Sequence, residues 1–425
     1  MTPAHKDARG RPLVAVTGMG LVTSLGLGKN NTWSALTSGR SGVKAIKRFP
    51  TDGLRTNFAA TVDFLDASQR SAPELAIDMA ARAAEEALAE ARIASNGGFP
   101  GPLFLATPPA ELEWPQRKAL YGAGGGSELR GYCRLAAAAR DGDWREMNSL
   151  FQFASVGEHL ARRFETQGIP VSVSTACASG ATAIQLGVEA IRRGDTEAVL
   201  CVGTDASVQI EALIRFSLLS ALSTRNDPPE CASRPFSKDR DGFVMGEGAA
   251  ALVLESYHAA RARGATILGL VRGCGERADN YHRTRSKPDA SPIIAAIANA
   301  LADSGLKPQD VDYINAHGTS TPENDKMEYL ALKGVLGCHL SATPISSNKS
   351  MIGHTLSAAG AIEAVISLMT IREGTIPPTI NYDLPDPAIP VDVVPNVARS
   401  MRVDTVLSNS FGFGGQNAAL VLSAP

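Results

Sequence analysis

The sequence predicts an α/β fold made of two similar halves. Short apolar runs of the kind that form buried strands alternate with helical stretches along the chain. The two halves share this rhythm, which indicates a duplicated unit, although 425 residues could also divide into two or three separate domains. Glycine is abundant, with 40 residues, so we expect many tight turns between the elements.

Four short segments are predicted to be strands. Residues 13–19 and 197–203 are apolar runs with glycine at or next to their ends, and residues 249–254 and 311–316 are similar. Cys201 lies within the second run and is expected to be a buried strand residue. Residues 115–150 are rich in Gly, Arg and Ala and are expected to be irregular with some helix.

Two helices are indicated by apolar residues that recur at steps of three and four. The first follows Cys177 and ends at Gly194, after two arginines in its last turn. The second runs over about residues 357–372 and ends before Gly374. The residues predicted to form one apolar face are Ala181, Ile184, Val188 and Ile191 in the first helix, and Ile362, Val365, Ile366 and Met369 in the second.

Composition excludes several classes of protein. The net charge is −2 without a clustered basic run, which argues against nucleic-acid binding. No window approaches the roughly 20 apolar residues that span a bilayer, and the first twelve residues, expected to be flexible, lack a secretory signal. The six cysteines are irregularly spaced, so we expect reduced cytoplasmic thiols, no zinc and no cofactor.

Three side chains are candidates for catalysis. Cys177 lies between a strand-like segment and a helix start, and a helix N-terminus is expected to lower its pKa. His317 follows the strand-like residues 311–316, and His354 follows Gly353, which allows a sharp turn. Each residue alone has an ordinary alternative: a buried structural cysteine, a turn histidine, and a histidine at a helix start.

The glycine-rich segment 409–417, N-S-F-G-F-G-G-Q-N, lacks the spacing of a dinucleotide-binding loop. It could present backbone N–H groups to a developing oxyanion, or it could be a tight turn. With S-T-A-C-A-S-G, D-R-D-G-F-V-M-G-E-G, N-A-H-G-T-S-T-P and N-K-S-M-I-G-H, it completes a set of motifs. In this order, the motifs resemble those of β-ketoacyl-[acyl-carrier-protein] synthases, the elongating type II enzymes above all. The resemblance covers about residues 13–60 and 151–425.

The resemblance implies a thiolase-like fold, with two similar halves in a five-layer α-β-α-β-α sandwich. Residues 13–260 would form the half with the nucleophile Cys177, and residues 261–425 the half with His317 and His354. It also implies a decarboxylating Claisen condensation between a Cys177-bound acyl chain and malonyl-[acyl-carrier protein], in a dimer with itself or a paralogue. The backbone N–H groups of Cys177 and Phe413 resemble the family's oxyanion hole.

The resemblance assigns supporting roles as well. Lys349 is expected to pair with Glu328 and to shape the field around His354, because an unpaired buried lysine is costly. Phe413 resembles a gating phenylalanine, whereas core packing is preferred for Phe411. The residues that match a structural cation site of some family members are Asn315, Glu363 and Asn409.

Other readings remain open. A thiolase would carry a second cysteine in the glycine loop, and a type III starter synthase would pair one histidine with an asparagine; neither pattern is present. A chain-length-setting partner subunit would lack the nucleophile. A polyketide or nodulation-type synthase shares all three residues and stays an alternative.

The chain departs from the family pattern at several places. Residues 104–150 do not follow the family pattern, and residues 104–113 replace its glycine-rich strand end. In the family this part helps to line the acyl tunnel and the dimer interface, which motivates the hypothesis of a tunnel for very long chains. Among residues 70–78, where family members carry a basic cluster for the acidic carrier, only Arg70 is basic, and Ser220 replaces an arginine. We therefore expect a specialised carrier or a partner subunit that supplies a basic face. Gln416 stands where threonine is common, without an explanation.

Overall fold

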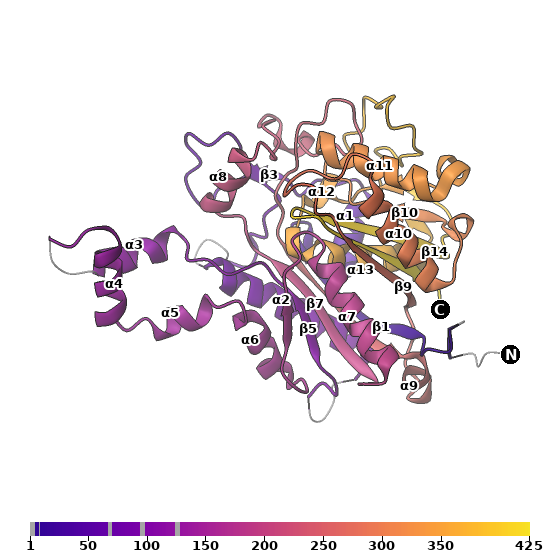
Figure 1. Ribbon diagram of the computed structural model, residues 1–425, viewed down its shortest axis with the longest axis horizontal. Helices are drawn as coiled ribbons and strands as arrows, with labels where there is room; N and C mark the ends of the chain where they lie inside the picture. Colours follow the sequence, from indigo (N-terminus) through magenta and orange to yellow (C-terminus); the bar gives the residue numbers. More distant parts are fainter. Residues whose placement is uncertain (1–4, 8, 67–69, 94–97, 124–127) are drawn as a thin grey trace.

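The computed structural model describes residues 5–7, 9–66, 70–93, 98–123 and 128–425. Within them, two sets of five strands form the centre of the molecule (Figure 1). The strands of the first set are β1 (Val14–Thr23), β5 (Leu103–Ala106), β6 (Val171–Val173), β7 (Ala198–Asp205) and β8 (Gly248–Ser256). Those of the second set are β9 (Gly269–Ala278), β10 (Tyr313–Asn315), β11 (Ile345–Ser346), β14 (Thr405–Gly412) and β15 (Gln416–Ser423).

Both sets have the same topology. The strands lie side by side in the order β6-β5-β7-β8-β1 in the first set and β11-β10-β14-β15-β9 in the second. If the five strands of each half are numbered along the chain, both orders read third, second, fourth, fifth, first. In each set the first three strands of that order are parallel, and the last two are antiparallel to their neighbours. A short antiparallel pairing of β1 with β9 joins the sets. The predicted duplication is therefore confirmed.

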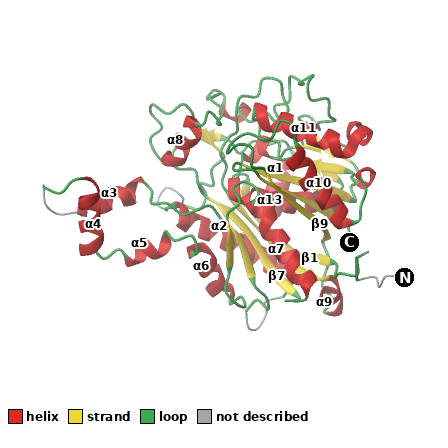
Figure 2. Ribbon diagram, viewed as in Figure 1, coloured by secondary structure: helices red, strands yellow, loops and turns green. Residues whose placement is uncertain are grey.

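Helices occupy the connections between the strands (Figure 2). Those of the first half are α1 (Lys29–Thr37), α2 (Ala72–Ala91), α3 (Trp114–Ala123), α4 (Gly131–Asp141), α5 (Arg145–Leu150), α6 (Ser155–Phe164), α7 (Ser179–Arg193), α8 (Ile210–Leu218) and α9 (Tyr257–Ala262). Those of the second half are α10 (Ser291–Ser304), α11 (Pro322–Leu336), α12 (Lys349–Ile352) and α13 (Ala359–Glu373), with a 3-10 turn, η5 (Leu356–Ala358), before the last. Of the described helices, none has the length and apolar character to cross a bilayer.

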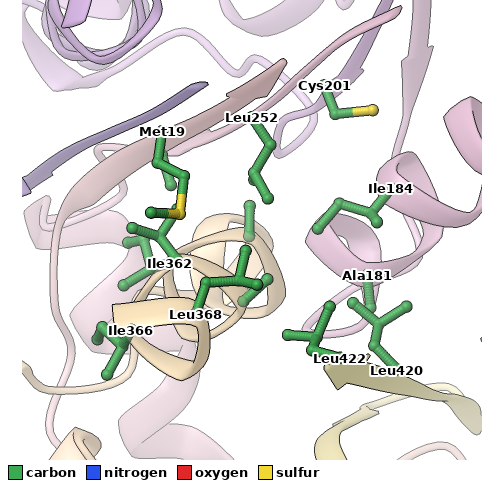
Figure 3. Packing of buried hydrophobic residues seen from close by; sticks show 14 of the residues in the cluster. Met19, Ala181, Ile184, Cys201, Leu252, Ile362, Ile366, Leu368, Leu420 and Leu422 are labelled. Carbon is green, nitrogen blue, oxygen red and sulfur yellow. The ribbon is translucent and has the colours of Figure 1, made fainter. Parts of the chain in front are cut away.

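The elements stack in the five layers that the sequence predicts. Helix α2 covers the outer face of the first strand set, and α10 with α11 covers that of the second. Helices α7 and α13 pack against each other between the two sets. Figure 3 shows this middle layer, where Ile184 of α7 and Ile362 of α13 lie among side chains such as Leu252 of β8 and Leu420 of β15.

Helix α13 differs from its prediction. An apolar stripe on one face was expected, but every residue from Ala359 to Thr370 is buried. The reason is its position, since α7 and strands of both sets surround it. A helix buried on all sides positions its neighbours rigidly, and the loop before it carries His354.

Residues 115–150 are more helical than predicted, because they form most of α3, α4 and α5. These three helices project from the body as an arm at the left of Figure 1. Residues 124–127 of this segment lie outside the described residues. The arm follows β5 at the point where the sequence departs from the family pattern.

The start of the chain was expected to be flexible. Residues 1–4 and 8 lie outside the described residues. In the remainder, the Arg11 guanidinium forms an ion pair with Asp303 of α10 at 2.8 Å and another with Asp7. The Asp303 ion pair joins this part of the segment to the second half, and the flexibility of the segment stays a prediction.

Candidate active site

Cys177 lies in the short connection from β6 to α7. The preceding residue, Ala176, has a φ of 49°. Non-glycine residues rarely adopt this left-handed backbone, and such strain gathers at functional sites. The Ser179 hydroxyl accepts the Thr175 N–H at 2.8 Å and so closes the turn around the cysteine. The turn presents a side chain that is 9% exposed.

Burial dominates the electrostatics of the Cys177 thiol. Loss of solvent raises its pKa to about 11, although the Phe413 N–H donates to the sulfur and Lys349 opposes the rise through its charge. The prediction of a lowered pKa is therefore wrong, since the helix start and these donors do not offset the desolvation. The Phe413 and Cys177 N–H groups both point at this sulfur.

His354 lies between α12 and η5. The preceding Gly353 has a φ of 66°, and a side chain there would meet the Met245 carbonyl at 2.9 Å, so the predicted sharp turn is confirmed. The Leu356 N–H donates to His354 Nδ1 at 3.3 Å, which leaves the proton of the neutral ring on Nε2. That Nε2 is buried without a partner among the described residues, and is thus an available donor.

His317 follows β10 and lies edge to face with His354, with ring centroids 5.2 Å apart. His317 Nδ1 is buried without a hydrogen-bond partner among the described residues, and the His317 ring lies 5.6 Å from that of Phe411. Phe411 is itself buried in the core of the second half, so the preference for core packing is confirmed.

Both imidazoles are held in the neutral form. Burial lowers the pKa of His317 and of His354 well below 6.5, and the charge of Lys349 lowers both further. Each ring can therefore donate one N–H without carrying a full positive charge. Ligating atoms of Cys177, His317 and His354 all lie within 4.8 Å of one another. One thiol and two imidazoles also form a donor set that zinc accepts.

The expected pairing of Lys349 with Glu328 is wrong. The Lys349 ammonium binds the carboxylate of Glu363 instead. Glu328 accepts the backbone N–H of His317 at 2.9 Å and that of Gly318 at 2.8 Å, so it fixes the histidine loop. Burial raises the pKa of Glu328 to about 7.

The cation candidates lie close to this ion pair. The Asn315 amide donates to the Glu363 carbonyl at 3.3 Å, and the Asn409 amide to Glu328 at 3.1 Å. Among the buried oxygens that lack a hydrogen-bond partner in the described residues, three belong to this group: Glu363 Oε2, Asn409 Oδ1 and Asn348 Oδ1. Oxygen donors of this type suit a hard cation. The residues therefore fit a cation, and Asn348 is a member that the sequence did not indicate.

A cavity of about 650 Å³ opens onto the three candidate residues. Phe413, which is 36% exposed, forms part of its wall. Thr319 and Thr321 also line it, and their hydroxyls are 2.8 Å apart. They were not singled out in the sequence, although the T-S-T that follows His317 is a local signal. No described residue between 104 and 150 lines this cavity.

Comparison with protein families agrees with this arrangement. Residues 12–260 match the family described as "Beta-ketoacyl synthase, N-terminal domain", and residues 268–383 match "Beta-ketoacyl synthase, C-terminal domain". The 3-oxoacyl-[acyl-carrier-protein] synthase 2 of Coxiella burnetii is 39% identical over 96% of this chain and 98% of its own. The tetracenomycin polyketide synthase ketoacyl synthase alpha subunit of Streptomyces glaucescens is 38% identical over 97% of both chains.

Solved structures give the same fold. A type II polyketide ketosynthase in complex with its acyl-carrier protein superposes with a TM-score of 0.86 at 32% identity, over 98% of this chain and 100% of the other. A β-ketoacyl synthase from Burkholderia phymatum superposes with a TM-score of 0.82 at 33% identity, over 97% and 99% of the two chains.

Proposed function

The chain belongs to the β-ketoacyl synthase family of condensing acyltransferases, and we propose that it elongates fatty acyl chains held on Cys177. Malonyl-[acyl-carrier protein] supplies the two added carbons. One observation carries the proposal: a thiol and two neutral imidazoles lie within 4.8 Å of one another on the wall of a single cavity. Cys177 comes from the first half and both histidines from the second, so the site requires the duplicated fold.

The first step is acyl transfer. The Cys177 sulfur attacks the carbonyl of an acyl thioester, and the N–H groups of Cys177 and Phe413 donate to the oxyanion that forms. The carrier's sulfur leaves and takes up the proton released by the thiol. Because the thiol pKa is about 11, this proton must depart during the attack. A neutral histidine next to the sulfur can relay it.

The second step is condensation. The malonyl group loses carbon dioxide, and its thioester oxygen becomes an enolate oxygen. The Nε2–H of His354 and the ring N–H of His317 stabilise that charge, since neutral rings donate without first losing a proton. The enolate carbon then attacks the Cys177 thioester, and the cysteine sulfur leaves and regains a proton. The product is a β-ketoacyl chain on the carrier.

The proposal is tested with a panel of acyl-carrier thioesters from C8 to beyond C20. Intact mass is read before and after malonyl carrier is added. Acylation of the protein that is lost in Cys177→Ala, followed by a product two carbons longer, supports the proposal and defines the chain length. A preference for chains beyond C18 would support the hypothesis of a long tunnel. A folded protein that no thioester acylates would instead be a non-catalytic partner subunit.

Polyketide extension is the second candidate. The Streptomyces relative and the carrier-bound ketosynthase named above favour it, since both act in polyketide synthesis by their names. The two activities differ in the primer, because a polyketide synthase extends an unreduced β-ketoacyl chain. A β-ketoacyl carrier offered as primer distinguishes them: repeated extension without a reductase favours polyketide synthesis, and a single round with a saturated primer favours fatty-acid elongation.

We also propose a structural cation held by Asn315, Glu363 and Asn409, with Asn348 as a fourth ligand. The three orphaned buried oxygens support it, because such groups ordinarily have a partner. A cation here would stabilise the fold beside the Lys349 ion pair. Melting temperature in potassium, sodium and choline chloride at equal ionic strength tests the site. Dependence on one small cation, lost in Asn409→Leu, is expected; equal melting in all three salts contradicts it.

We propose further that two copies of the chain, or one copy and a paralogue, pair through the arm and the edge strand β6. Large apolar side chains are exposed on both: Trp114 and Tyr132 of the arm are 63% and 83% exposed, and Val171 of β6 is 40% exposed. Strand β6 ends the strand order, so its outer edge can accept a further strand. Exposed apolar patches of this kind mark protein contacts.

A further inference from the structure

Three cationic side chains line the active-site cavity. Arg283 and Arg285 come from the loop that follows β9, and Lys326 comes from α11. Leu219 and Ser220, just after α8, line the same cavity and carry no charge. Ser220 stands at the position of the family arginine, so this position supplies no cation to the cavity.

The loop that carries the two arginines is held in place by hydrogen bonds. The buried Asp279 carboxylate accepts the N–H of Tyr281 at 2.9 Å and that of Lys287 at 2.7 Å. The Arg283 carbonyl accepts the Gly414 N–H at 2.7 Å, which ties the loop to the turn that bears Phe413. A loop fixed in this way presents its side chains with a reduced cost in conformational entropy.

The two arginines lack an internal counter-charge. Lys287, in the same loop, pairs with Asp289, but neither Arg283 nor Arg285 forms an ion pair among the described residues. Lys326 likewise has none there. Three carboxylates, Asp241, Asp279 and Glu323, also line the cavity and balance the charge of the three cations. Among the described residues, none of these carboxylates forms an ion pair with Arg283 or Arg285, so both exposed guanidinium groups can bind an anionic ligand.

We propose that Arg283 and Arg285 bind the phosphate of the phosphopantetheine arm by which a carrier protein delivers its thioester to Cys177. The inference rests on the proposed function. An acyl thioester reaches the buried sulfur while the phosphate at the far end of the arm stays near the protein surface, where these exposed arginines lie. One guanidinium group can donate two parallel hydrogen bonds to the oxygens of a phosphate, and the opposite charges strengthen both bonds. The malonyl carboxylate is a poorer match, because it must lie beside the buried histidines.

The test compares two small thioesters with the same acyl group, one on 4′-phosphopantetheine and one on pantetheine without the phosphate. The rate of Cys177 acylation is followed by intact mass at low substrate concentration. A charged hydrogen bond is typically worth a factor of about ten. We expect the wild type to prefer the phosphorylated thioester about tenfold, and Arg283→Ala/Arg285→Ala to lose that preference. Added salt should reduce it in the wild type.

Arg261→Ala on α9 is the matched control, because this arginine is exposed and does not line the cavity. Arg261→Ala should keep the wild-type preference for the phosphorylated thioester. Arg283→Lys/Arg285→Lys should keep part of that preference. A preference that survives in the double alanine variant overturns the proposal. An equal loss with both thioesters also overturns it and assigns the loop to positioning of Phe413. If the double alanine variant is acylated more slowly only by the intact carrier protein, the arginines bind an acidic surface of the carrier and not the phosphate, and the proposal is overturned. Failure of the proposed function is distinct, since neither thioester would then acylate the wild type.

Discussion

Lys349 and Glu363 form a buried ion pair, with side chains 2% and 1% exposed. The lysine charge lowers the pKa of His317 and of His354, and it also opposes the raised pKa of Cys177. Burial is the main cause of the neutral imidazoles, and the Glu363 carboxylate holds in place the lysine charge that adds to it. A second buried carboxylate, Glu328, fixes the backbone of the His317 loop.

Replacement of Lys349 should lower the free energy of unfolding, because the carboxylate of the ion pair loses its partner. Lys349→Met leaves the Glu363 carboxylate buried without a partner, at a cost of about 3–5 kcal/mol. Glu363 then binds a proton in the folded state, because burial already raises its pKa. A carboxyl whose pKa is raised on folding loses stability as pH rises, so the variant should weaken from pH 5 to pH 8. Chemical denaturation measures this. Lys349→Met/Glu363→Leu should recover part of the loss, and an equal loss in both variants would contradict the argument.

Substitutions of His354 and of Cys177 should affect different steps of the reaction. His354→Asn removes the Nε2–H donor, so release of carbon dioxide from malonyl carrier should fall about a hundredfold to a thousandfold. Acylation of Cys177 should fall far less, because its oxyanion donors are backbone N–H groups. Radiolabelled carbon dioxide and intact mass follow the two steps, and Cys177→Ala controls for the second. Equal losses in both steps would show that His354 serves the acyl transfer instead.

The raised pKa of Cys177 predicts a steep pH dependence of alkylation. A thiol with a pKa of about 11 is protonated at neutral pH, and its thiolate fraction grows tenfold per pH unit below that value. Iodoacetamide labelling of this residue, followed by peptide mass, should therefore rise about tenfold per unit from pH 7 to pH 9 without a plateau. Lys349→Met removes a charge that lowers this pKa and should slow labelling at every pH. A plateau near pH 7 would indicate a thiolate and refute the raised value.

The turn that bears Phe413 offers a matched pair of glycines. Gly414 and Gly415 have φ values of 89° and 85°, so alanine strains the backbone at both, by about 1–2 kcal/mol. A side chain at Gly415 would lie 1.8 Å from the Asp279 carbonyl, whereas nothing lies within 4 Å at Gly414. Gly415→Ala should therefore lower the melting temperature more than Gly414→Ala and slow Cys177 acylation as the turn shifts. Equal effects would show that strain alone matters.

The sequence predicts much of this arrangement because its signals are local. A few neighbouring residues determine each of three features: the strand before Cys177, the turn at Gly353 and the segment around His317. The partner of Lys349 is not, because Glu328 and Glu363 both lie on distant helices and only the packing of α13 selects Glu363. The Cys177 pKa depends likewise on burial by both halves. Helix was expected in part of residues 115–150, but its extent was underestimated because few side chains of the arm are buried, so no apolar stripe marks the helices.

The arm also provides the last prediction, which concerns assembly. Tyr132 lies on α4 and is 83% exposed, and Trp114 at the start of α3 is 63% exposed. If the arm pairs with a second chain, Tyr132→Glu buries a charge in that contact and should shift the protein from dimer to monomer in sedimentation. Leu218→Glu on α8 is the control, since Leu218 is 80% exposed and lies outside the arm. A wild-type monomer that becomes a dimer only with an added paralogue would indicate a heterodimer. A monomer under all these conditions would leave the arm without a pairing role and would contradict the proposal.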